Sequence, residues 1–307
     1  MRVGLSWDLD RFDDPAAGWK EVVSEVEQAD KMGFHSFWIH EARERAADCP
    51  EPSVFLTYLS QRTKSGQLRI AGRRVTRALP PHISEEVSVL DTFSRGRAGL
   101  AFASGSSQGV PAAHVHEMIE FVSASWAADE IRYRGDFVRF PAHTPDSAPR
   151  GVSYPEDEPD YVAQWDWGPE TPDFLSITPK PYVPYAPLNV EINDDETLEW
   201  AAQQGVSPMI AADMPTAEGV ERLARYRECA DKAGRSRREV EVVMERRVAL
   251  DGEADDHTLG GSPRDVLNAI RKLRGKTGVS HFVWRRNGAT PMDFYRFSSE
   301  VQVLLQA

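Results

Sequence analysis

The chain has 307 residues, of which 41% are hydrophobic and 27% are charged, so it can bury a large core and is not expected to be disordered. Its 48 acidic residues outnumber 36 basic ones and give a formal net charge of −12, which argues against binding to nucleic acid or to an anionic membrane. The two cysteines, Cys49 and Cys229, form no CxxC pair, so we expect neither a disulfide scaffold nor a metal site. No apolar run approaches the roughly 18 residues of a membrane span, and we expect a cytoplasmic protein without a secretion signal.

Short runs rich in Val, Ile, Phe and Trp alternate along the chain with longer stretches of helical pattern. Eight runs are predicted to be strands: Val3–Trp7, Ser36–His40, Leu68–Gly72, Ala98–Ala103, Leu188–Ile192, Pro208–Ala212, Val240–Val248 and His281–Trp284. Eight stretches are predicted to be helices: Gly18–Met32, Pro52–Thr63, Ser84–Phe93, Val115–Ala127, Glu196–Gln203, Ala217–Ala233, Pro263–Leu273 and Pro291–Leu305. This alternation predicts an α/β protein with a parallel sheet closed on itself, the (β/α)8 or TIM barrel, as a single domain over residues 1–307.

One segment does not fit the alternation. Residues 142–187 are dense in proline, acidic and aromatic residues, a composition that suits neither a regular helix nor an inner strand. We predict that this segment is a long insertion between the fourth helix and the fifth strand. Loops of this length are usually functional or disordered, and Trp165 and Trp167 favour a lid that packs on the mouth of the barrel.

Two short segments resemble known catalytic motifs but match them incompletely. The run Gly105-Ser106-Ser107-Gln108-Gly109 matches the GxSxG of a nucleophile elbow, but no HGGG-type segment accompanies it and Pro111 delays the following helix, so a simple Gly/Ser loop is the better interpretation. His116-Glu117 lacks the second histidine of HExxH. We expect His114 and His116 to face water at the start of a helix.

Five segments, in order and at matching spacing, resemble the luciferase-like flavin-dependent monooxygenases and their deazaflavin-dependent relatives. They are Ala29–Ile39, Ser84–Arg97, Phe121–Trp126 with Tyr133–Phe137, Pro179–Pro181 with Thr197–Gly205, and Gly261–Val266. The second, SEEVSVLDTFSRGR, is the most specific. The resemblance implies an α/β barrel with a flavin at the carboxyl ends of the strands. It implies FMN, used as reduced flavin, with the deazaflavin coenzyme F420 as the alternative cofactor.

The catalytic histidine of the family is not at its usual position. Members that activate oxygen usually carry Glu-His-His after the second strand, and the matching residues here are Glu41-Ala42-Arg43. His40 shares a strand face with Ala42, so we predict that its imidazole substitutes for the missing one, with Arg43 near it if the chain turns at Ala42. The alternative is that His40 is only a polar residue at a strand end.

The expected phosphate site also departs from the family. The arginine that follows the fourth strand in relatives appears here as Ser104, and the turn after the fifth strand is rich in acids. The candidate cofactor-binding residues are Gly72, Ser104, Gly105, Asn193 and Thr197. The alternative for this turn is that Asn193 or Asp194 simply caps the next helix.

Arginines after the third and eighth strands could supply the positive charge that Ser104 lacks, or could form ordinary ion pairs. They are Arg73, Arg74, Arg77, Arg285 and Arg286.

The predicted function is that of a flavin-dependent monooxygenase that uses reduced flavin and O2 on a small organic substrate. A separate flavin reductase would supply the reduced flavin, and a homodimer or heterodimer is expected. Two alternatives remain open. One is a non-catalytic partner subunit of a luciferase-like heterodimer, consistent with Ala42 and Ser104. The other is a deazaflavin-dependent hydride-transfer enzyme on the same barrel.

Overall fold

Eight parallel strands close into a barrel in the computed structural model, which describes residues 1–7, 15–42, 49–75, 79–140, 176–183, 186–235, 240–286 and 290–306. In spatial order the strands are β1 (Arg2–Trp7), β2 (Ser36–His40), β3 (Gln67–Arg73), β4 (Ala98–Phe102), β7 (Leu188–Glu191), β8 (Ser207–Ile210), β9 (Val243–Leu250) and β11 (His281–Arg286). Pairing of β8 with β9 and of β11 with β1 completes the cylinder. The prediction of a (β/α)8 barrel is therefore confirmed.

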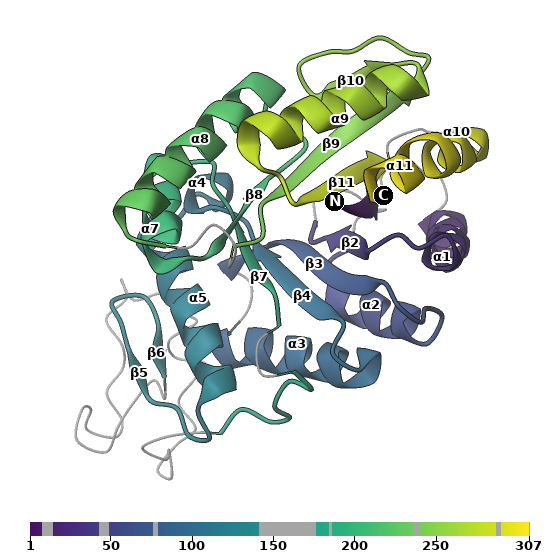
Figure 1. Ribbon diagram of the computed structural model, residues 1–307. Helices are drawn as coiled ribbons and strands as arrows, with labels where there is room; N and C mark the ends of the chain where they lie inside the picture. Colours follow the sequence, from purple (N-terminus) through teal and green to yellow (C-terminus); the bar gives the residue numbers. More distant parts are fainter. Residues whose placement is uncertain are drawn as a thin grey trace, which may run out of the picture.

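The helices form an outer ring around these strands (Figure 1). They are α1 (Pro15–Lys31), α2 (Pro52–Ser60), α3 (Pro80–Ser94), α5 (Ala112–Ala127), α7 (Asp195–Gln204), α8 (Thr216–Lys232), α9 (Pro263–Thr277), α10 (Pro291–Phe297) and α11 (Val303–Gln306). Local signals set their ends: α9 starts at a capping box between Ser262 and Asp265 and stops at Gly278, whose φ is 61°. Among the described helices, none combines the length and the apolar character needed to cross a bilayer.

Four features depart from the predicted alternation. A strand, β10 (Thr258–Gly261), pairs with β9, and a short helix, α4 (Gly105–Gln108), follows β4. The strands β5 (Tyr133–Arg134) and β6 (Arg139–Phe140) form a small hairpin. The helix expected at the end of the chain is divided into α10, the π-helical segment η4 (Ser298–Gln302) and α11. Of the expected insertion, residues 142–175 and 184–185 lie outside the described residues, as do Trp165 and Trp167.

The side chains that point into the barrel form three layers, an apolar one between two polar ones. This layer consists of Trp38, Ala71, Ala101, Met209, Val243 and Val283, all fully buried and distinct from the main core between strands and helices. Polar side chains lie below it, where the strands begin, and above it, where they end. The upper region is the mouth of the barrel, the end at which barrel enzymes bind their ligands.

Candidate active site

A buried carboxylate organises the mouth of the barrel. Glu245 of β9 is fully buried, and its Oε1 accepts hydrogen bonds from Ser6 Oγ (2.5 Å) and His40 Nε2 (2.8 Å). Its Oε2 accepts from the backbone N–H of Ala212 (3.1 Å) and lies 3.5 Å from Nη1 of Arg285. Donors from β1, β2, β11 and the end of β8 thus converge on one side chain.

Glu245 is ionised and fixes the orientation of His40. Burial alone would raise the pKa of Glu245, but the charges of His40 and Arg285 and the hydrogen bonds from His40 and Ser6 hold it well below its usual range. An ionised carboxylate only accepts hydrogen bonds, so Nε2 of His40 carries a proton. The Nδ1 atom is then the ring nitrogen that remains available to a ligand, and the side chain is 16% exposed.

Gly72, a candidate cofactor-binding residue, lies beside this free nitrogen. It has a φ of +64° at an irregularity of β3, and a Cβ built there would lie 3.7 Å from Nδ1 of His40. A glycine therefore suits this position both in backbone conformation and in leaving space next to the imidazole.

The residues after His40 leave the strand. β2 ends at His40, and the N–H of Ala42 donates to the carbonyl of Cys49 (3.2 Å). The carboxylate of Glu41 accepts from Nη1 of Arg73 (2.9 Å), so Glu41 does not orient His40. Arg43, expected near the imidazole if the chain turns at Ala42, lies outside the described residues.

A second carboxyl group of the mouth has an unusual environment. Glu191 of β7 is 6% exposed, and its Oε2 accepts from Nδ2 of Asn193 (3.3 Å). Burial raises the pKa of Glu191 to about 7; the charge of His40 and the backbone N–H of Ser104 oppose this rise, whereas Asp213 and Glu245 add to it. Glu191 is therefore partly protonated at neutral pH.

Ser104 and Gly105 form part of the turn after β4. Ser104 is fully buried and caps α4, with Oγ accepting from the N–H of Ser107 (3.3 Å). A Cβ on Gly105 would lie 2.7 Å from the carbonyl oxygen of Val110, so the glycine allows a close approach of two chain segments. Both residues thus have structural roles that do not depend on a cofactor.

Asn193 and Thr197 lie in the turn after β7. Asp194 caps α7 by accepting from the N–H of Thr197 (2.7 Å), so the alternative of a simple N-cap holds for Asp194. Nδ2 of Asn193 donates to Oγ of Ser107 (2.8 Å), which joins the turns after β4 and β7. Among the described residues, Oδ1 of Asn193 and Oγ1 of Thr197 are buried and have no hydrogen-bond partner.

Two of the five candidate arginines are used in buried ion pairs. Besides Glu41, Arg73 contacts Glu86 (2.8 Å), and fully buried Arg286 binds both oxygens of Glu25 (2.9 and 2.6 Å). For these two the ion-pair alternative is correct. Arg285 is the arginine that reaches Glu245 at the mouth, and Arg77 lies outside the described part of the chain.

The prediction that His114 and His116 face water is wrong. Both are buried in α5, and the ring of His116 stacks on Trp200 of α7 with centroids 4.2 Å apart and planes 3° from parallel. Burial lowers the pKa of His116 to about 4, so this imidazole is neutral. Its partner lies 84 positions further along the chain, so the local pattern gave no sign of the contact.

A second His–Glu pair lies at the opposite end of the barrel. Nε1 of Trp38 donates to Oγ of Ser36 (2.7 Å), which lies 2.7 Å from Nε2 of His281. The Ser36 proton therefore points to His281, whose Nδ1–H donates to Oε1 of Glu241 (3.0 Å). Burial lowers the pKa of His281 to about 4, so a neutral ring with both nitrogens satisfied completes the network.

This lower cluster has the composition of a metal site but not its electrostatics. Ligand atoms of His35, Glu241 and His281 lie within 4.8 Å of one another. The carboxylate of Glu241, however, already pairs with the guanidinium groups of Arg2 (2.7 Å) and Arg69 (2.5 Å). Two fixed positive charges on one ligand oppose a divalent cation, so we assign a structural role to the cluster.

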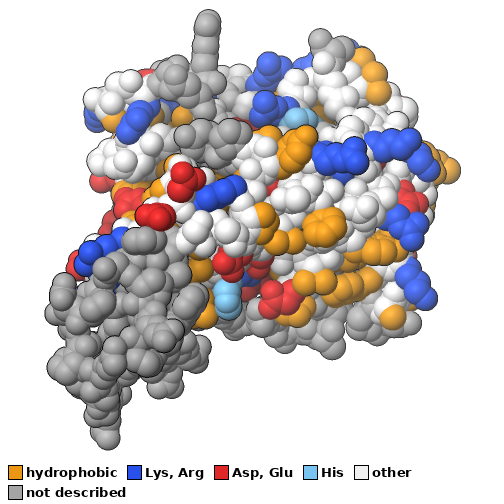
Figure 2. Space-filling view, turned by 90° about the horizontal axis from the view of Figure 1, so that it is seen from below, with side chains coloured by type: hydrophobic (Ala, Val, Ile, Leu, Met, Phe, Trp, Pro, Cys, Tyr) orange, Lys and Arg blue, Asp and Glu red, His pale blue; other side chains and the backbone are white. Residues whose placement is uncertain are grey.

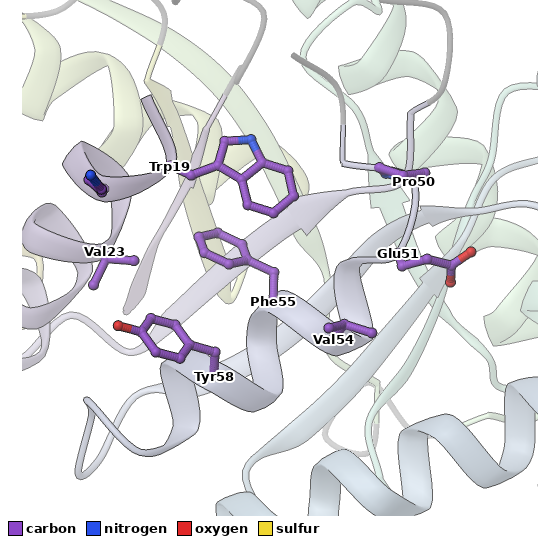
Figure 3. A pocket seen from close by; sticks show the side chains of 8 residues that line it. Trp19, Val23, Pro50, Glu51, Val54, Phe55 and Tyr58 are labelled. Carbon is purple, nitrogen blue, oxygen red and sulfur yellow. The ribbon is translucent and has the colours of Figure 1, made fainter. Parts of the chain in front are cut away.

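A cavity of about 600 Å³ lies between α1 and α2, outside the barrel interior (Figure 3). Trp19 and Phe55 form an aromatic wall, with ring centroids 4.9 Å apart. The lining residues are Trp19, Lys20, Val23, Pro50, Glu51, Val54, Phe55 and Tyr58. None of the polar groups described above for the mouth takes part in this cavity.

Solved structures with a similar fold cover nearly the whole chain. The monooxygenase RslO1 from Streptomyces bottropensis has a TM-score of 0.74 at 19% identity and covers 99% of this chain and 100% of its own. The oxygenating constituent of 3,6-diketocamphane monooxygenase from the CAM plasmid of Pseudomonas putida, in complex with FMN, has a TM-score of 0.69 at 16% identity and covers 98% of both chains. The coenzyme F420-dependent tetrahydromethanopterin reductase from Methanopyrus kandleri has a TM-score of 0.70 at 14% identity and covers 99% of both. At such identities the likeness concerns the fold alone.

No curated protein matches the chain. The family model of the luciferase-like monooxygenases matches residues 2–259. This match includes His40, Glu191 and Glu245, whereas β11 with Arg285 lies beyond it. The sequence match extends over most of the barrel and agrees with the architecture. The chain therefore belongs to the luciferase-like monooxygenase family.

Proposed function

We propose that this protein is a flavin-dependent monooxygenase in which His40 acts at the mouth of the barrel. The observation that carries the proposal is the hydrogen bond of 2.8 Å between Nε2 of His40 and the buried carboxylate of Glu245. An imidazole oriented by an ionised carboxylate, with one nitrogen turned to the ligand end of a barrel, is an arrangement suited to acid–base chemistry.

The turns after β4 and β7 fit the hydroxyl-bearing chain of a flavin better than they fit a phosphate. Oδ1 of Asn193 is a buried acceptor without a partner among the described residues, and a hydroxyl group is a donor. Asp194, whose Oδ2 accepts from Ser106 (3.2 Å), would repel a phosphate dianion. We therefore expect Asn193, with Thr197 behind it, to hold ribityl hydroxyls, which FMN and coenzyme F420 share.

A bound flavin would supply the redox chemistry, and the side chains would supply orientation and proton transfer. In the neutral form of His40 the single ring proton lies on Nε2, so Nδ1 has a free lone pair and can accept a proton from the substrate. The negative charge of Glu245 then stabilises the imidazolium that forms. Trp38, which lies two residues before His40 on the same strand face, provides an apolar floor beneath the imidazole.

Two other functions remain candidates because Ala42 and Ser104 replace the residues usual in the family. A deazaflavin-dependent hydride-transfer enzyme would use the same mouth with coenzyme F420. A non-catalytic partner subunit would not need the proton transfer that we propose for His40. The buried charge of Glu245 favours an active mouth over the partner subunit, since strongly perturbed, paired carboxylates are concentrated at functional sites.

The test is His40→Ala, with cofactor binding and turnover measured separately. Titration with reduced FMN, oxidised FMN and coenzyme F420 identifies the cofactor by a saturable absorbance or fluorescence change. Rapid mixing with oxygen then measures how fast the bound reduced cofactor is consumed. We expect the rate to fall by about 10²–10⁴-fold in His40→Ala with unchanged affinity, because general acid–base catalysis has this magnitude. The exposed histidine variant His82→Ala is the matched control.

Each result selects one candidate. Unaltered turnover in His40→Ala would make His40 structural and refute the proposed mechanism. Binding of coenzyme F420 but not of FMN would favour hydride transfer, and binding of neither would favour the partner subunit.

We also propose that the protein forms a dimer and receives reduced flavin from a separate reductase. Large apolar side chains are exposed on the neighbouring helices α2 and α3, namely Val54 (70%), Tyr58 (47%), Val89 (37%) and Phe93 (57%). Figure 2 shows apolar groups among charged ones on the face that carries α3 in Figure 1. Light scattering of the purified protein measures the mass, and a monomer at micromolar concentration would contradict the dimer.

A further inference from the structure

Two carboxyl groups share the mouth with His40, but their partners differ. Both oxygens of Glu245 are used, by Ser6, His40, Ala212 and Arg285, and its pairing with a cation keeps it ionised. A carboxylate held in this way is a fixed charge. It can orient a neighbouring imidazole but is poorly placed to exchange protons with a ligand.

Glu191 also points into the barrel. Its strand neighbour Asn189, two residues earlier and therefore on the same face, accepts from Arg69 of β3 (3.1 Å). Since β4 separates β3 from β7, this contact crosses the interior. Glu191 thus lies one layer higher, at the mouth.

The partners of Glu191 are neutral donors, in contrast to those of Glu245. They are the backbone N–H of Ser104 and the amide of Asn193, and no arginine or lysine is among its partners in the part of the chain that the structure describes. The charged groups that face it are His40 of β2, Glu245 of β9 and Asp213 after β8, two of them negative.

We propose that Glu191 and His40 form the acid–base pair of the mouth, in which Glu191 gives a proton to the bound ligand and Nδ1 of His40 accepts one from it. This inference rests on the proposed function for its ligand, a flavin with its substrate. Together the two transfers leave Glu191 as a carboxylate and the initially neutral His40 as an imidazolium, so the net charge of the buried mouth is conserved. The pair is restored when the proton returns from His40 to Glu191 through solvent.

The protonation states of the two carboxyl groups agree with this division of roles. Burial raises the pKa of Glu191 to about 7, whereas Glu245 stays ionised beside it. Two carboxyl groups whose environments move their pKa values in opposite directions are the usual mark of separate acid and base functions in one site. The neutral form of Glu191 also donates a hydrogen bond, so it selects ligands that offer an acceptor such as a carbonyl oxygen.

The first experiment needs no ligand. Infrared difference spectra between acidic and alkaline pH detect the carbonyl stretch of protonated carboxyl groups, and the variant Glu191→Gln removes one of them. Burial raises the pKa of Glu86 to about 7 as well, so we expect wild type to show two carboxyl components that titrate near pH 7. The component of Glu191 should be absent from Glu191→Gln, and that of Glu86 should remain. The exposed control Glu196→Gln should retain both components. An unchanged band in Glu191→Gln would overturn the proposal.

The second experiment measures the proton exchanged on binding. Titration calorimetry with FMN or coenzyme F420 in buffers of different ionisation enthalpy gives the number of protons taken up or released. We expect a non-zero number near pH 7 in wild type and a value near zero in Glu191→Gln; equal numbers in both would overturn the role of Glu191 toward the ligand. Turnover of Glu191→Gln should fall by about 10²-fold or more and lose its decline above pH 7, and Glu191→Asp should restore part of it.

These two experiments separate the inference from the proposed function. If neither cofactor binds, the proposed function and the role of Glu191 toward its ligand both fail. The infrared titration still decides whether Glu191 holds a proton at neutral pH. If a cofactor binds and the band is unchanged, the proposed function stands and Glu191 is not the acid.

Discussion

Replacing Glu245 with glutamine tests how the mouth of the barrel is held together, because the amide keeps the shape of the carboxylate but loses its charge. Oε1 of Glu245 accepts from Ser6 and His40, and Oε2 faces the backbone N–H of Ala212 (3.1 Å) and the guanidinium of Arg285 (3.5 Å). In glutamine one of these atoms becomes an NH2 group. At the Oε2 position this group meets two groups that can only donate, so two hydrogen bonds are lost. At the Oε1 position it can donate to the Ser6 hydroxyl or to Nε2 of His40, so charge-assisted hydrogen bonds are replaced by weaker neutral ones.

The magnitude follows from the charge and burial of the group. Hydrogen bonds to charged groups contribute about 1.5–3 kcal/mol each, so the loss of two gives about 3–6 kcal/mol as an upper range. Arg285 is 19% exposed and regains contact with water when the carboxylate is removed, which lowers the cost. We expect Glu245→Gln to reduce the free energy of unfolding by about 3 kcal/mol at pH 7.

The pH dependence of this difference has a definite sign. The pKa of Glu245 is lower in the folded protein than the value of about 4.3 for an unfolded chain. Its contribution to stability is therefore fully present above about pH 4.3 and is lost as the pH falls toward the folded pKa. The difference between wild type and Glu245→Gln should be constant between pH 7 and about pH 5 and should shrink below that.

Urea denaturation followed by tryptophan fluorescence measures both quantities, with the exposed variant Glu196→Gln as the control. Surface substitutions and weak ion pairs change the free energy of unfolding by less than about 1 kcal/mol. A change this small at pH 7 would show that Glu245 is not a buried, ionised carboxylate with several strong hydrogen bonds. A difference that grows as the pH is lowered from 5 would show that the pKa of Glu245 is raised rather than lowered.

Two further substitutions test other parts of the description. Glu241→Gln at the opposite end of the barrel leaves the guanidinium of Arg69 fully buried without its carboxylate, and we expect a loss of about 3–5 kcal/mol in the free energy of unfolding, measured with urea. A loss near zero would show that Arg69 finds another partner. Asp194→Ala removes the cap of the Thr197 N–H, and thermal unfolding should report a loss of about 1 kcal/mol; an unchanged midpoint would mean that α7 needs no cap.

The barrel could be predicted from the sequence because its signals are local. The predicted strand Ser36–His40 agrees with β2, since a short apolar run between turn residues fixes both of its ends. β10 (Thr258–Gly261) was missed because its sequence TLGG contains two glycines and one large apolar residue. It is defined instead by its pairing with β9, which only the assembled sheet provides.

The position of His40 at the mouth could be predicted from the sequence, whereas its catalytic role stays a prediction. His40 is found by its place at the end of a strand, a rule that holds for any barrel. Its partner Glu245 lies 205 residues away, and nothing in the sequence joins the two. The signal that was available is the alternation of Glu241, Val243 and Glu245 within one predicted strand, which places two acids on the inward face of a barrel.

The two His–Glu pairs of this barrel show why the same residue types lead to different roles. At the lower end, both nitrogens of His281 are used, by Ser36 and by Glu241, and guanidinium groups neutralise the carboxylate. That imidazole has no free lone pair, and its proton cannot leave without breaking the network. At the mouth, Glu245 uses one nitrogen of His40, and the other faces a glycine without a side chain. An imidazole contributes to chemistry through the nitrogen that the fold leaves open, and for this reason we propose the upper histidine, and not the lower one, as the acid–base group.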